Sequence, residues 1–115
     1  MKVYEESIEE GEKKLSGCLI KMENASILLL DEADNIRLGT LAVGMPEFDG
    51  KYHMSSVLLG DRNVMDAKLL AERVSASIGG IALVSIRMEP LAGLASLAPL
   101  MKLAMKLVEK SKREE

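Results

Sequence analysis

The sequence predicts an α+β domain in which one antiparallel sheet of about six strands carries two helices. Three observations lead to this prediction. Side chains alternate between polar and apolar over residues 2–22, and short polar turns separate the apolar runs as far as residue 43. A strand–helix–strand pattern fills residues 55–88, and helical spacing returns over residues 91–111. Period-two alternation is typical of strands and three-to-four-residue spacing of helices, so the domain needs both.

The first half of the chain is predicted to be a four-strand antiparallel meander. We expect its strands over residues 2–9, 13–22, 26–31 and 36–43. The third strand contains the continuous run Ile27-Leu28-Leu29-Leu30. Such a run is typical of a strand that is covered on both faces.

Residues 44–54 form the longest segment without periodicity, and Pro46 lies within it. This segment holds Phe48, Tyr52 and His53, which include the only histidine of the chain. Because loops often carry contacts that a scaffold positions, we treat these three residues as a candidate partner-binding loop. The alternative is that Phe48 and Tyr52 only pin the loop onto the sheet.

The strand–helix–strand part consists of a strand at 55–59, a helix at 64–78 and a strand at 81–88. Apolar residues three or four positions apart line one face of this helix, namely Val64, Ala67, Ala71, Val74 and Ile78. Lys68 lies off that face.

Turn-forming residues lie at both ends of the same helix. Asp61 or Asn63 can cap its first turn by accepting a hydrogen bond from an N–H, and for Asp61 this role is favoured over ligand binding. Gly79 and Gly80 suit a left-handed cap at its end.

The last helix is predicted over residues 91–111, with a kink where Pro99 removes a backbone hydrogen bond. Its apolar residues cover more than half of its circumference: Leu100, Met101, Leu103, Ala104, Met105, Leu107 and Val108. One sheet face does not hide so wide a surface. We therefore expect a homodimer with Met101, Met105 and Val108 at the interface. The alternative is a helix enclosed within a monomer. Residues 110–115 are expected to be a frayed tail.

The bulk properties exclude several classes of function. A chain of 115 residues is long enough for a single domain with its own core, here taken as residues 1–115. Its net charge of −3 provides no basic field for nucleic acid. No apolar run approaches the roughly 18–20 residues that span a membrane. One cysteine, Cys18, and an acidic N-terminus agree with a cytoplasmic location.

No catalytic residue, cofactor or metal is expected. His53 and Cys18 supply too few ligands for a zinc site. Gly60-Asp61 lacks the glycine spacing and the lysine of a phosphate-binding loop. The acidic run between Glu5 and Glu12 is typical of a solvated face.

Four segments together resemble a known family. Val57-Leu58-Leu59-Gly60-Asp61, Leu83-Val84-Ser85-Ile86 and Leu38-Gly39-Thr40-Leu41-Ala42-Val43 occur in the order and spacing of the proteasome assembly chaperones, and Gly93-Leu94 with Leu97 is similar to the start of their last helix. The resemblance is to the third and fourth proteasome-assembling chaperones, as an archaeal-type homologue, over roughly residues 15–108.

This resemblance implies a non-enzymatic assembly chaperone that binds proteasome α-type subunits as their ring forms. It also implies that Leu58, Leu59, Gly60 and Asp61 are structural residues of the family motif. The eukaryotic relatives pair as heterodimers, so a single chain that is similar to both members implies a homodimer.

A dimeric adaptor of the roadblock type, which acts on a small GTPase, is the main alternative. That fold opens with a helix, whereas residues 2–22 here alternate as strands. A small-molecule enzyme is a third option, although no motif above supports it.

Overall fold

The computed structural model describes residues 1–11, 13–48, 52–88 and 97–114. For Glu47, Phe48, Tyr52 and His53 it describes the backbone only. Six strands and two helices follow one another in this order: β1 (Lys2–Glu10), β2 (Lys13–Lys21), β3 (Ala25–Asp31), β4 (Thr40–Phe48), β5 (Tyr52–Leu59), α1 (Val64–Ile78), β6 (Ile81–Arg87) and α2 (Leu97–Arg113).

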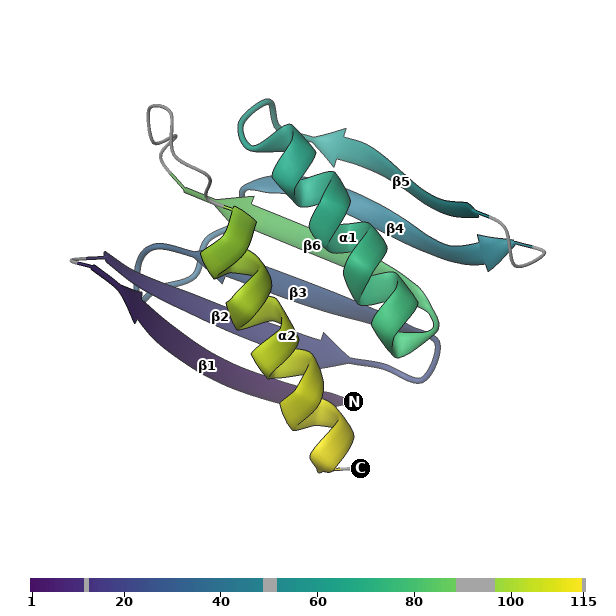
Figure 1. Cartoon of the computed structure of the whole chain (residues 1–115), viewed down its shortest axis with the longest axis horizontal. Helices are drawn as coiled ribbons and strands as arrows, with labels where there is room; N and C mark the ends of the chain where they lie inside the picture. The colour runs from purple at the N-terminus through teal and green to yellow at the C-terminus, as the bar shows by residue number, and fades with distance from the viewer. Residues whose placement is uncertain (12, 49–51, 89–96, 115) are drawn as a thin grey trace.

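The molecule has two layers, a six-stranded sheet and a pair of helices that both lie on the same face of it (Figure 1). Helix α1 packs on β4, β5 and β6, and α2 packs on β1 and β2. The core fills the space between these layers, with side chains such as Leu28, Leu70 and Leu103 fully buried. Helix α2 also contacts α1, so the helices form one continuous layer.

The predicted α+β class is confirmed, but the predicted four-strand meander is wrong. The strand order is β1-β2-β3-β6-β4-β5, so only the first three strands form a meander. Strand β6 lies between β3 and β4, parallel to β3 and antiparallel to β4. Strands adjacent in sequence usually pair, which favoured β3 beside β4. Helix α1 instead carries the chain across β4, and β6 takes the position beside β3.

The strands around the predicted loop at 44–54 are longer than expected. Strand β4 begins at Thr40 rather than at residue 36 and continues to Phe48. Strand β5 starts at Tyr52 and pairs with it. Pro46 fits within β4 because the register shifts between Met45 and Phe48, where the hydrogen-bonded ladder is irregular.

Helix α1 begins and ends where the sequence predicts, and it lies very close to the sheet. Ala71 and Val74 are fully buried, as expected. A side chain at Gly44 of β4 would collide with the backbone carbonyl of Ala71. Small residues on both elements therefore set how closely the helix approaches the sheet.

Of the two predicted caps of α1, the glycine cap at its end is confirmed and the side-chain cap at its start is not. Gly79 adopts a left-handed conformation with φ 84°, and its N–H donates to the carbonyl of Ser75 at 2.8 Å, as expected for a glycine cap. Asn63 stands at the N-cap with φ 56° but makes no side-chain cap hydrogen bond. Its amide donates instead to the carbonyl of Met88 at 3.2 Å, so the expected side-chain cap is wrong. A tertiary contact with the end of β6 takes the place of the local one.

Helix α2 is described from Leu97 to Arg113, and Pro99 lies in its first turn. Proline is tolerated there because the first N–H groups of a helix have no partner within it. This start is consistent with the predicted kink, while residues 91–96 of the predicted helix lie outside the described residues. The helix continues to Arg113, and Ser111 is fully buried with its hydroxyl donating to the Val108 carbonyl. Residues 110–113 are therefore helical rather than frayed.

A buried carboxylate fixes the connection between β3 and β4. Asp31 has no exposed surface and accepts hydrogen bonds from the backbone N–H groups of Ala33 and Arg37, at 3.0 and 2.9 Å. It also accepts two from the guanidinium of Arg37. Desolvation raises the pKa of Asp31, but these hydrogen bonds and the charge of Arg37 outweigh it and hold the pKa below its usual value.

Asp31 should make folding stability depend on pH in the acid range. A carboxylate whose pKa is lower in the folded state stabilises fully above its unfolded pKa of about 4, and the contribution is lost as pH falls through the folded value. Asp31→Asn should lower the free energy of unfolding at neutral pH by about 1–3 kcal/mol. It should also flatten the acid dependence in urea titrations. Asp34→Asn, a matched change in an exposed partner of Lys14, should cost less than about 1 kcal/mol, and an equal loss would contradict this assignment.

Val74 and Lys68 test the orientation of α1. Val74→Asp places an unpaired charge in the core and should cost several kcal/mol. Lys68 lies off the buried face of the helix, so Lys68→Asp should change the free energy of unfolding by less than about 0.5 kcal/mol. Chemical denaturation of both variants measures the difference, and similar losses would refute the packing of α1.

Candidate interaction surface

The face of the sheet that carries no helix presents a row of apolar side chains. The strand register aligns Ile20, Ile27, Leu83 and Val43 directly beside one another across β2, β3, β6 and β4. We call these four residues the apolar row. Their sequence neighbours, such as Leu19, Leu28 and Val84, are fully buried and face the helices. Successive side chains of a strand point to opposite faces, so the apolar row lies on the helix-free face.

Further apolar side chains extend the row. Val3 of β1 pairs with Ile20 and is 54% exposed. A second line, one pleat along, contains the half-buried Leu29 and Leu41, together with Cys18 and Ser85, which are buried. All four residues of the apolar row are half-buried rather than covered. Contiguous exposed apolar surface on a protein commonly marks a contact with another molecule.

The run Ile27-Leu28-Leu29-Leu30 led us to expect a strand covered on both faces. Within the chain the two faces of β3 differ: Leu28 and Leu30 are fully buried under the helices, while Ile27 and Leu29 on the helix-free face are only half-buried. The expectation was therefore wrong for the single chain. The apolar row was missed as a site, although apolar residues at consecutive strand positions were its signal in the sequence.

Of the residues expected at a dimer interface on α2, Val108 lies in the core of the chain, while a contact through Met101 and Met105 stays a prediction. Val108 is 2% exposed and belongs to the core, so it has no surface to offer a partner. Met101 and Met105 are partly buried against the same core. The hydroxyl of Ser77 on α1 lies 3.9 Å from the sulfur of Met105. Helix α2 thus packs against both the sheet and α1, and this second contact hides more of its apolar surface than one sheet face does.

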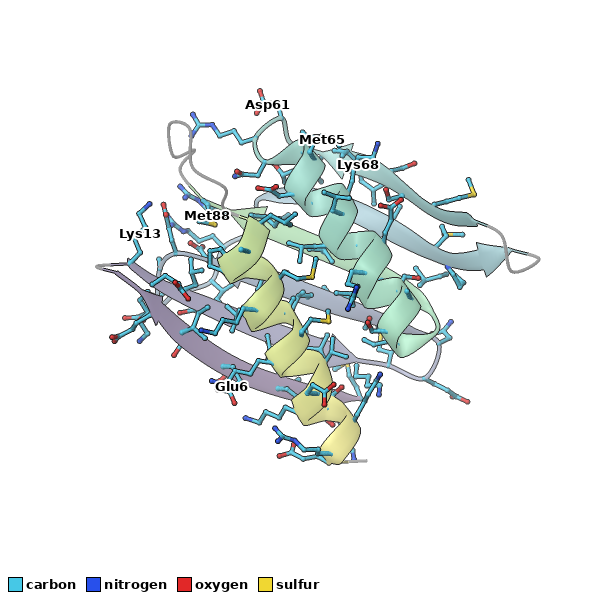
Figure 2. All side chains as sticks on the ribbon, viewed as in Figure 1. Glu6, Lys13, Asp61, Met65, Lys68 and Met88 are labelled. Atoms are coloured by element: carbon cyan, nitrogen blue, oxygen red, sulfur yellow. The ribbon has the colours of Figure 1, made fainter. Side chains whose placement is uncertain are left out.

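Charges also hold α2 against β1. Lys102 lies 3.6 Å from Glu10, and Lys106 and Lys110 lie 3.6 and 3.4 Å from Glu6, which is labelled in Figure 2. Desolvation raises the pKa of Glu6, but the two lysines outweigh it and lower that pKa. Part of the acidic run on β1 therefore meets the lysines of α2 instead of being only a solvated face.

The other predicted site residues lie around β5. Phe48 ends β4 and pairs through its backbone with Tyr52, and His53 follows in β5. The side chains of these three residues lie outside the described structure, so the partner-binding loop stays a prediction. Leu58 and Leu59 end β5 and are 55% and 45% exposed.

Gly60 of the predicted motif has a clear structural role. Its φ is 94°, and a Cβ there would lie 2.5 Å from the hydroxyl oxygen of Thr40. Both the conformation and the space require glycine. Asp61 follows it on the surface and does not cap α1 through its side chain.

Within the described residues, no group of three acidic, histidine or cysteine side chains is placed to hold a metal ion. The expectations of no metal and no cofactor stay predictions. Neither described helix is long and apolar enough to cross a membrane.

Comparison with known proteins shows the fold. No protein-family model matches the sequence, and no curated protein matches it significantly. Among solved structures, a chain described as "Crystal Structure of a Novel Chaperone Complex for Yeast 20S Proteasome Assembly" is similar with a TM-score of 0.69. The match covers 94% of this chain and 99% of that chain at 11% sequence identity. The chain therefore has the fold of a proteasome assembly chaperone.

The packing of α2 predicts how the protein responds to changes at Met101 and Met105. Replacing both by Lys should lower the free energy of unfolding by several kcal/mol, because two ammonium groups would lie against the core. Chemical denaturation measures the loss, with Lys102→Met at an exposed position of the same helix as the control. A fully stable double variant that only loses mass in sedimentation would favour the dimer contact first expected there.

Proposed function

We propose that this chain is a non-enzymatic assembly chaperone that binds proteasome α-type subunits while their ring forms, and that it acts as a homodimer in the cytoplasm. The fold supports the proposal because nearly the whole chain matches a chain of a proteasome assembly chaperone complex. The main support for the proposal is the apolar row on the helix-free face, because a binding protein needs an exposed apolar surface.

We assign the contact between the two copies to the apolar row. Two sheets pack stably face to face when their inner faces are apolar and their strands lie at a small angle. The row has no charged residue, so two copies can meet without burying an unpaired charge. Burying a side chain of Leu size gives about 1.5–3 kcal/mol, and several such residues from each copy offset the entropy of association.

The same arrangement accounts for transient binding. With the sheets packed together, the helices face outward and the remaining surfaces of the dimer are free for an α-type subunit. Contacts within the growing ring then compete with those to the chaperone and release it. No step of this cycle needs a catalytic group, and we propose that the chain has no enzymatic activity of its own.

The roadblock-type adaptor has less support. That fold opens with a helix, whereas this chain opens with the hairpin of β1 and β2. No observation on the described residues favours a GTPase as the partner.

Sedimentation and co-purification test the two parts of the proposal separately. The wild-type protein should sediment as a dimer, and Leu83→Arg should give a folded monomer because it puts a charge in the middle of the apolar row. Leu38→Arg, at a residue that is 61% exposed and outside the row, should leave the dimer intact. A wild-type monomer at high micromolar concentration would refute the dimer.

The partner is tested by co-expression with an α-type subunit from the same source. The two proteins should co-purify, and a GTPase from that source should not. Co-purification with the GTPase alone would overturn the chaperone assignment while leaving the dimer result unaffected.

A further inference from the structure

The two edges of the sheet differ in charge. Strand β1 forms one edge and contains Lys2 and four glutamates. Strand β5, from Tyr52 to Leu59, forms the other edge and contains no Asp, Glu, Lys or Arg. Charged side chains on an edge strand discourage pairing with another strand, and their absence leaves the edge open to it. Of the two edges, β5 is therefore the one suited to accept a further strand.

A hollow lies beside this edge, between β5 and α1. Its volume is about 380 Å³, and its lining includes Met54, Met65 and Leu69. These three side chains are 60%, 64% and 41% exposed. Lys68 and Glu72 complete the α1 side of the hollow. Figure 2 shows Met65 and Lys68 near the start of α1, on the side toward β5.

We propose that the β5 edge and this hollow together bind an extended, uncharged segment of a partner protein, which adds to the sheet as a further strand. The outer backbone groups of an edge strand are complementary to the backbone of another strand, and this specifies the conformation of the ligand. The hollow specifies its side chain, a large apolar one that contacts Met65 and Leu69. Backbone hydrogen bonds supply affinity in this mode of recognition, and the side-chain pocket supplies selectivity.

A second copy of the chain fits this edge less well. Helix α1 lies over β4, with β6 and β5 on either side of it. If two β5 strands paired, the two α1 helices would be separated by three strand spacings, about 14 Å. Packed helices lie about 8–10 Å apart. Self-pairing would thus leave Met65 and Leu69 exposed between the helices, whereas a bulky side chain of a partner segment fills the space.

The identity of the segment rests on the proposed function, in which an α-type subunit supplies it, but strand addition itself does not. The test therefore uses no proteasome subunit. Its probe is a short fluorescent peptide of alternating threonine and leucine, titrated against the full-length protein. We expect saturable binding that Leu69→Lys and Met65→Lys each weaken by about tenfold. Ser7→Lys, at an exposed residue of the charged edge strand β1 and outside the apolar row, should leave binding unchanged.

A second peptide distinguishes strand addition from nonspecific apolar binding. It has the same side chains but N-methylated backbone amides on one edge, so it cannot donate the hydrogen bonds of a strand. We expect its binding to be lost. Equal binding of both peptides, no binding of the first, or insensitivity to Leu69→Lys would each overturn the proposal. A drop in sedimenting mass for Leu69→Lys in the absence of peptide would also overturn it, because the occupant would then be a second copy.

Discussion

The position of β6 determines the rest of the structure. Its register with β3 on one side and with β4 on the other joins two parts of the sheet that are otherwise separate, the meander of β1 to β3 and the hairpin of β4 and β5. Helix α1 connects β5 to β6, and it crosses β4 at the close contact between Gly44 and Ala71. With β6 in place, α1 and α2 come to lie side by side on the same face of one sheet.

The consequence of this arrangement is a sheet whose two faces are covered unequally, because both helices lie on one face and the apolar row on the other face stays half-buried. The strands carry apolar side chains on both faces, as Leu28 and its neighbour Ile27 illustrate. The first is enclosed by the helix layer, and the second is left half-exposed beside Leu83. A chain with this pattern gains further stabilisation only from a second molecule, which is why we assign binding to the helix-free face.

Helix α2 illustrates how two kinds of interaction can share one element. Its apolar side meets the sheet and α1, while Lys106 and Lys110 reach Glu6 at the edge of the sheet. These exposed ion pairs add little stability individually, but they fix which way the helix lies along β1. Glu6, which forms these ion pairs, belongs to the β1 edge, whereas the β5 edge contains no Asp, Glu, Lys or Arg.

The sequence by itself determined the local elements: strand alternation, the bounds of α1 and the glycine cap at Gly79 all follow from periodicity and short-range chemistry. It also determined the α+β class. Only the tertiary structure decided the strand order, the N-cap contact from Asn63 to Met88 and the walls that enclose Met105, because each depends on residues far apart in the chain. The interaction surface falls in the same category. Apolar residues such as Ile27 and Leu83 are visible in the sequence, but whether a strand face is covered depends on which side the helices take.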